Sequence, residues 1–191
     1  MVPVSAPPEL PAIVARAFEV SRRAGYVSFC RNETGRLLAA LAATRSGILA
    51  EFGTGCGVGT AWLRSGVRRG SHILTAELDA TLASAAQEIF EEDPQVEVLA
   101  ADWSTLRNKG PYSLLFLDPS VPQDAGVDAV ADLVEPGGIV VLDDFAPCEQ
   151  WPPITAGRVD VLREGWLTDE RFVAAEVMIA PDAAVIIATR R

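Results

Sequence analysis

Histidine and cysteine are scarce in this sequence, and long apolar runs are missing. The 191 residues include one histidine and three widely separated cysteines, which excludes the paired spacing of a zinc site or a disulfide framework. No apolar run is long enough to cross a membrane. Residues 1–8 show no basic segment followed by an apolar core, so we expect no signal peptide. These absences favour a cytoplasmic protein that does not bind membranes.

Positively charged residues are also fewer than negatively charged ones. The chain has 16 Lys and Arg residues against 26 Asp and Glu residues, which gives a formal net charge of −10. A field of this sign repels phosphate backbones, and nucleic-acid-binding proteins usually carry a basic patch. The basic runs at 22–23, 68–69 and 190–191 are short and resemble solvated helix ends. We therefore expect no nucleic-acid partner.

The order of apolar runs predicts an α/β protein. Helical spacing is seen over 9–24, and Asn32 or Thr34 is placed to cap a second helix that runs to about 44. Predicted strands then alternate with predicted helices, the strands over 47–52, 72–77, 96–100, 112–118 and 139–142, and the helices over 60–65, 80–92 and 123–134. Such alternation is typical of parallel βαβ units with helices on both faces.

The end of the chain departs from this alternation. Two β-rich runs, 172–179 and 183–189, are joined by Ala180-Pro-Asp182 and predict a hairpin, so that the last strand should run antiparallel. At this length we expect one domain over 1–191, with N-terminal helices in 1–45 and the α/β core in 46–191.

A glycine-rich turn follows the first predicted strand. Gly53, Gly55, Gly57 and Gly59 lie between that strand and a predicted helix. Glycine permits a sharp turn and a close approach of ligand to backbone, and open α/β sheets bind ligands at the carboxyl ends of their strands. Glycines that serve only the turn itself are the alternative, because a lone glycine motif is weak evidence.

Two carboxylates follow the next strands in order. Glu77 ends the second predicted strand, where nucleoside-binding proteins place a carboxylate on the ribose hydroxyls. Asp102 follows the third strand, where it can meet an adenine amino group, and Trp103 beside it offers an aromatic face. Each alone is more often a solvated acidic residue at a strand end, but their order after successive strands indicates a nucleoside site.

With these pieces the sequence resembles the class I S-adenosylmethionine-dependent methyltransferases, in particular the small catechol and caffeoyl-CoA O-methyltransferases. The resemblance runs from about residue 30 to the C-terminus. It is carried by Glu33-Thr-Gly-Arg-Leu-Leu38, Glu51-Phe-Gly-Thr-Gly-Cys-Gly57, Thr75-Ala-Glu77, Ala101-Asp102, Leu115-Phe-Leu-Asp118 and Pro136-Gly-Gly-Ile-Val-Val-Leu-Asp-Asp144. It implies a Rossmann-like, seven-stranded, mostly parallel sheet with an antiparallel C-terminal hairpin.

The resemblance also implies a cofactor site for S-adenosylmethionine. The turn would lie against the methionine portion, Glu77 would hold the ribose, and Asp102 with Trp103 would border the adenine. The residues expected to contact the cofactor are Glu51, Gly53, Thr54, Gly55, Gly57, Glu77, Asp102, Trp103 and Asp118.

Three aspartates suggest a divalent metal. Asp118, Asp143 and Asp144 end two strands expected to be neighbours, and oxygen ligands suit Mg²⁺ or a similar cation. In the metal-dependent enzymes that this chain resembles, such positions bind the metal, and Asp118 would be the catalytic residue. Those enzymes commonly have Asn where this chain has Asp144, and often lysine where it has Val121. The alternative is that the pair at 143–144 only binds water.

Three functions remain open at this point. The first is methyl transfer to a hydroxyl of a small molecule, and the second is an NAD-dependent Rossmann oxidoreductase. The glycine spacing and the terminal hairpin argue against the second. The third is a non-catalytic methyltransferase-like domain, which the missing lysine favours. Because the chain is too short for a separate substrate domain, a homodimer is a further expectation.

Overall fold

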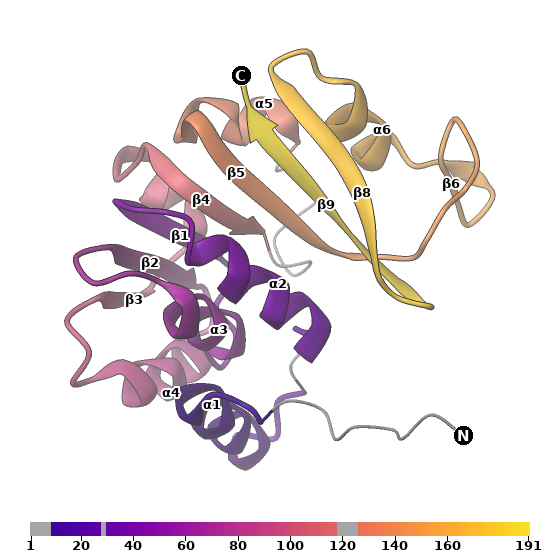
Figure 1. The fold of residues 1–191 in the computed structure, drawn as a ribbon. Coiled ribbons are helices and arrows are strands. Elements are labelled where there is room, and N and C mark those ends of the chain that lie inside the picture. Colours follow the sequence, from indigo (N-terminus) through magenta and orange to yellow (C-terminus); the bar gives the residue numbers. More distant parts are fainter. Residues whose placement is uncertain (1–8, 28–29, 118–125) are drawn as a thin grey trace, which may run out of the picture.

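A seven-stranded sheet forms the centre of the molecule (Figure 1). The structure is a computed structural model that describes residues 9–27, 30–117 and 126–191. The strand order is β3-β2-β1-β4-β5-β9-β8. The strands are β1 Ile48–Phe52, β2 His72–Glu77, β3 Val96–Ala100, β4 Tyr112–Leu117, β5 Val134–Phe145, β8 Phe172–Ala180 and β9 Ala183–Arg190. β1 to β5 pair in parallel, whereas β9 is antiparallel to both β5 and β8. The predicted fold class and terminal hairpin are therefore confirmed.

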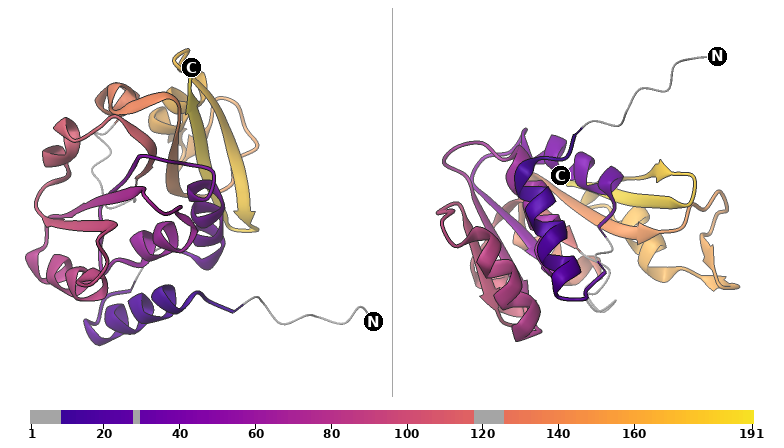
Figure 2. Two further views of the ribbon diagram at one scale, coloured as in Figure 1. Left: turned by 60° about the vertical axis from the view of Figure 1, so that its left-hand side comes forward. Right: turned by 90° about the horizontal axis from the view of Figure 1, so that it is seen from below.

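Helices cover both faces of this sheet (Figures 1 and 2). One face is covered by α1 Ala12–Arg23, α2 Asn32–Ala42, α3 Val58–Gly66 and α4 Ala80–Phe90. The other carries the short helices η1 Trp103–Asn108, α5 Val127–Val130 and η2 Ala131–Leu133, together with α6 Val161–Thr168. A small hairpin of β6 Ile154–Thr155 and β7 Arg158–Val159 lies apart from the main sheet.

The inner strands β1, β2 and β4 are buried on both faces, as strands of parallel sheets usually are, whereas β3 and β8 at the sheet edges are partly exposed. In β4, Leu114 and Phe116 join the core under α1 to α4, while Leu115 and Leu117 join the core on the opposite face. Because side chains alternate along a strand, the continuous apolar run 112–117 fills two cores at once. β4 is thus the central strand, as its sequence predicted.

The start of α2 differs from the prediction. Neither Asn32 nor Thr34 caps the helix: Asn32 is its first residue, and the capping position belongs to Arg31, which makes no side-chain cap. The Thr34 hydroxyl donates instead to Oδ1 of Asp143 over 3.1 Å. The Thr34 hydroxyl therefore bonds to a tertiary partner in β5 instead of to the backbone at the start of the helix.

The helix predicted over 123–134 is confirmed over 127–133, as α5 followed by the 3-10 helix η2, but it ends one residue earlier than predicted. α5 ends at Val130, and β5 begins at Val134. The Pro136-Gly137-Gly138 segment, expected to stop a helix, lies within β5 at a register shift: Val134 pairs with Tyr112, whereas Ile139 pairs with Leu114. The extra residues form a bulge, in which glycine is common because it tolerates irregular backbone.

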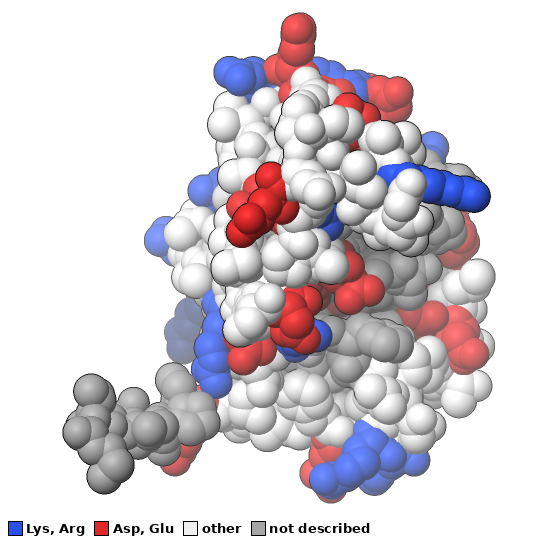
Figure 3. Space-filling view, turned by 90° about the vertical axis from the view of Figure 1, so that its right-hand side faces the viewer, with Lys and Arg blue, Asp and Glu red and all other residues white. Residues whose placement is uncertain are grey.

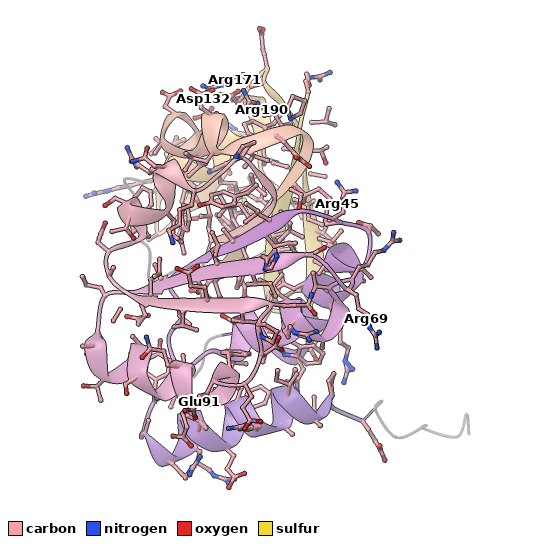
Figure 4. All side chains as sticks on the ribbon, turned by 90° about the vertical axis from the view of Figure 1, so that its left-hand side faces the viewer. Arg45, Arg69, Glu91, Asp132, Arg171 and Arg190 are labelled. Atoms are coloured by element: carbon pink, nitrogen blue, oxygen red, sulfur yellow. The ribbon has the colours of Figure 1, made fainter. Side chains whose placement is uncertain are left out.

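Ion pairs fasten the end of the hairpin to the neighbouring short helices. Arg190 of β9 lies 3.2 Å from Asp132 of η2, and Arg171 reaches Asp128 of α5. Figure 4 shows Arg171, Asp132 and Arg190 together at one end of the molecule, with Glu91 of the α4 end far from them. Among the described residues no helix is both long enough and apolar enough to cross a membrane.

Candidate functional site

A buried polar network lies directly beneath the glycine-rich turn. Glu51 at the end of β1 is 1% exposed, and its Oε2 accepts hydrogen bonds from the hydroxyls of Thr60 and Thr75. Thr75 is its cross-strand neighbour on β2 and also shares a 2.5 Å hydrogen bond with Thr54 of the turn. A buried carboxylate needs such donors to offset lost hydration. Glu51 and Thr54 thus brace the turn from below.

The glycines of the turn have packing partners of their own. A Cβ on Gly59 would lie 2.1 Å from Oε1 of Glu51, so only glycine lets α3 approach the buried carboxylate. Gly53, Gly55 and Gly57 have φ of 91°, 53° and 83°, values that favour glycine over any other residue. The conformation of the turn therefore depends on packing against Glu51 of β1 and on the close approach of α3, as well as on the backbone freedom of its glycines.

Glu77 is held in place by two backbone amides. The Gly55 N–H donates to its Oε2 over 2.7 Å, and the Asp79 N–H donates to its Oε1 over 2.9 Å. Each carboxylate oxygen can accept two hydrogen bonds, so each keeps capacity for a further donor. The side chain is half-buried at the carboxyl end of β2. It is thus fixed beside the glycine turn in a form that can receive two hydroxyl groups.

The expected adenine region is also built around existing contacts. Asp102 caps η1 by accepting from the Ser104 N–H over 2.9 Å, and hydrogen bonds from the Ser104 side chain and backbone lower its pKa. Trp103 stacks on Phe52 with ring centroids 5.0 Å apart, and the Arg107 guanidinium lies 4.8 Å from the Trp103 ring. The Asp102 carboxylate is exposed, and its lowered pKa favours the ionised form.

Leu78 is a residue that sequence reasoning missed. It follows Glu77 directly and is 74% exposed, which makes it one of the most exposed large apolar side chains among the described residues. A single exposed apolar side chain is common on protein surfaces, and it is the place of Leu78 beside the fixed Glu77 carboxylate that makes it a candidate contact for a flat, apolar ring. Its position after the strand could have been noted in the sequence, but its exposure could not.

The acidic site is described only in part. Asp118 lies outside the described residues, as do positions 119–125, so the assignment of catalysis to Asp118 stays a prediction. Oδ1 of Asp143 accepts from the Thr34 hydroxyl and from the Asp144 N–H, and Asp144 adopts a left-handed φ of 69°. Within the described ranges no three Asp, Glu, His or Cys side chains gather as a metal site would require. The metal also stays a prediction.

A buried arginine fixes the chain just after this pair. Arg163 of α6 is 2% exposed, donates to the Ala146 carbonyl over 2.6 Å and lies over the Phe145 ring at 5.0 Å. It also lies 3.5 Å from both Asp160 and Glu176. The segment that leaves β5 beyond Asp144 is therefore anchored to α6 and β8.

Charge on the β8 side of the molecule is uneven (Figure 3). Asp and Glu side chains are spread through the middle of this face, whereas Lys and Arg mostly lie toward its periphery. An anionic polymer that approached this face would meet carboxylates first, which is unfavourable.

The comparisons with known proteins found matches among solved structures alone. No family model and no curated protein matches the sequence. Among solved structures, a methyltransferase from Geobacter sulfurreducens has a TM-score of 0.75 at 16% identity, covering 100% of this chain and 98% of that one. An O-methyltransferase from Bacillus cereus, solved with S-adenosylhomocysteine, has a TM-score of 0.71 at 18% identity and coverages of 95% and 92%. The O-methyltransferase TomG from Streptomyces achromogenes, solved with S-adenosylmethionine, has a TM-score of 0.74 at 18% identity and coverages of 96% and 92%.

The three neighbours are thus a methyltransferase and two O-methyltransferases solved with S-adenosylhomocysteine or S-adenosylmethionine, and the similarity covers nearly the full length of each. This chain has their Rossmann-like fold, with the sheet order and antiparallel terminal strands described above. The resemblance stated from the sequence is confirmed at the level of the fold.

Proposed function

We propose that this protein is an S-adenosylmethionine-dependent methyltransferase that acts on a hydroxyl oxygen of a small molecule. The observation that carries the proposal is the Glu77 carboxylate, held by the Gly55 and Asp79 amides at the carboxyl end of β2. A fold shared with cofactor-bound O-methyltransferases supports it. We expect the protein to work in the cytoplasm, without nucleic acid or membrane, and as a homodimer.

The residues present fit this cofactor. Glu77 is pre-positioned to accept two ribose hydroxyls, and Leu78 beside it offers an apolar surface to the adenine. Asp102 carries an exposed acceptor for an amino group. When bound, S-adenosylmethionine supplies a methyl group on a positively charged sulfur, open to in-line displacement. The protein's own contribution is then to orient the two reactants and exclude water, which can account for a large share of the rate enhancement.

A divalent metal is the less supported part of this proposal. Asp143 and Asp144 end β5 side by side, but Oδ1 of Asp143 is already occupied by two hydrogen bonds. The described residues alone do not complete a metal site. We therefore assign no chemical step to a metal, and titration with Mg²⁺ tests whether the acidic site binds one.

One observation favours a non-catalytic domain as the second candidate. Val121 stands where the enzymes that this sequence resembles often carry lysine, so a ready proton acceptor is missing there. Such a domain would bind cofactor and transfer no methyl group.

Two measurements test the proposal. Calorimetric titration of the purified protein should show binding of S-adenosylhomocysteine and none of NADH at matched concentration; the reverse result would identify an oxidoreductase instead. Transfer of label from methyl-labelled S-adenosylmethionine to a panel of catechols and phenols then tests catalysis. Cofactor binding with no transfer to any member of the panel would favour the non-catalytic candidate.

A further inference from the structure

Tyr26, which follows α1, lies directly on the glycine-rich turn. A Cβ built on Gly55 would come within 3.0 Å of Cε1 of Tyr26 and within 3.2 Å of its phenol oxygen. The space that a side chain at position 55 would fill is therefore taken by the tyrosine ring. No local pattern predicts this contact, because the two residues are far apart in the sequence.

The end of α1 determines where Tyr26 lies. The Tyr26 N–H donates to the Ser21 carbonyl over 3.0 Å, and the Gly25 N–H donates to the Arg22 carbonyl over 3.2 Å. Gly25 has a φ of 66°. Together these form a Schellman motif, which fixes the direction of the chain as it leaves a helix. The tyrosine backbone is thus fixed by the helix and its glycine.

Ser21 ties the same tyrosine to the turn a second time. Its hydroxyl donates to the Tyr26 carbonyl over 2.5 Å, and its side chain is hydrogen-bonded to the Cys56 thiol. Ser21 is 2% exposed and Cys56 is 1% exposed, so this link is buried. Cys56 is the residue after Gly55, which means that α1 holds Tyr26 and the turn in one arrangement.

The position of the phenol has a chemical consequence. The Gly55 amide binds Oε2 of Glu77, the carboxylate expected to hold the ribose, while the phenol oxygen lies against the same glycine. A phenol both donates and accepts hydrogen bonds, so it can bond with a ribose hydroxyl or with the polar groups of the amino-acid portion. Tyr26 is only half-buried, which leaves part of its side chain accessible.

We propose that Tyr26 is a cofactor-contact residue whose phenol hydroxyl hydrogen-bonds the ribose–homocysteine portion of the cofactor. Its ring covers the glycine-rich turn at Gly55, on the side that faces α1. The inference rests on the proposed function, since it requires that this pocket take S-adenosylmethionine.

The test measures affinity for S-adenosylhomocysteine by calorimetry in Tyr26→Phe, which removes only the hydroxyl. Loss of one hydrogen bond should weaken binding about 5- to 10-fold. The melting temperature of the ligand-free variant, measured in parallel, reports what the hydroxyl contributes to stability when no ligand is bound. Ser21→Ala keeps the phenol and removes the hydrogen bond to the Tyr26 carbonyl, so it should weaken binding by a smaller factor. Val27→Ala, a change at the exposed neighbouring residue, is the matched control and should have no effect.

The outcomes separate the two proposals. If the unaltered protein binds S-adenosylhomocysteine and Tyr26→Phe binds it equally well, the tyrosine serves only packing and this inference is overturned while the proposed function stands. If the unaltered protein binds no S-adenosylhomocysteine, both are overturned.

Discussion

Replacing Glu77 by alanine removes the carboxylate on which the proposed cofactor site depends. In the structure this carboxylate accepts the Gly55 and Asp79 amides at 2.7 and 2.9 Å, and it retains room for two more donors. The substitution therefore removes the two bonds expected to the ribose. It also releases the Gly55 amide, which lies in the turn itself.

The expected loss follows from the kind of hydrogen bond involved. Bonds from a hydroxyl to an ionised carboxylate contribute about 1.5–3 kcal/mol each. Two of them at the lower value amount to about 3 kcal/mol, which corresponds to a dissociation constant raised roughly 100-fold. Glu77→Gln keeps the shape and one acceptor oxygen, so it should weaken binding by about 10-fold.

Calorimetric titration with S-adenosylhomocysteine measures this loss. Glu97→Ala is the matched control, because Glu97 is an exposed carboxylate on the neighbouring β3, bound to Lys109 at 2.8 Å. It removes the same charge and should leave the affinity unchanged. A dissociation constant for Glu77→Ala within about threefold of the original would refute the ribose assignment.

Three other predictions concern packing, pH and metal. Gly35→Ala places a Cβ 2.2 Å from the buried Trp62 ring and should lower the free energy of unfolding by at least about 1–3 kcal/mol. Gly165→Ala, whose Cβ would meet no atom within 4 Å, should raise it by about 0.5–1 kcal/mol. Denaturant unfolding compares the two variants, and equal effects would contradict the contact between Gly35 and Trp62. The amides of Leu82 and Thr81 lower the pKa of Asp79, so the stabilising effect of this carboxylate is present above the unfolded pKa of about 3.9 and is lost as pH falls below it. The difference in melting temperature between the unaltered protein and Asp79→Ala should therefore be full at about pH 6 and shrink in acid. A difference that is independent of pH would be inconsistent with this role. Titration with Mg²⁺ in the presence of S-adenosylhomocysteine should show binding that Asp143→Asn weakens about tenfold or more, and no binding by the unaltered protein rejects the metal.

Much of the sheet could be predicted from the sequence because its signals are local. β2 and β3 have the predicted bounds, 72–77 and 96–100, and the hairpin of β8 and β9 lies where two β-rich runs flank a short turn. Strands buried on both faces are mostly apolar, so their composition helps to identify them. Glu77 could be selected because the carboxyl ends of parallel strands have a fixed place in such folds.

The errors occurred where a distant contact decides the local structure. Thr34 has the chemistry of a helix cap but donates to Asp143, over a hundred residues away. The strand predicted from 139 begins already at Val134, because pairing of Val134 with Tyr112 of β4 makes the glycines at 137 and 138 part of a bulged strand. The helix over 161–168 was not predicted, and its Arg163 is buried against Phe145.

By itself, the sequence determined the alternation of strands and helices, the antiparallel end of the sheet and the place of the glycine turn. These properties depend on composition, periodicity and backbone freedom, which neighbouring residues carry. Only the tertiary structure decided that the Glu51 carboxylate is enclosed, that two amides fix Glu77 and that Tyr26 lies on Gly55. Burial and hydrogen-bond partners arise when distant segments pack together, and no local pattern records them.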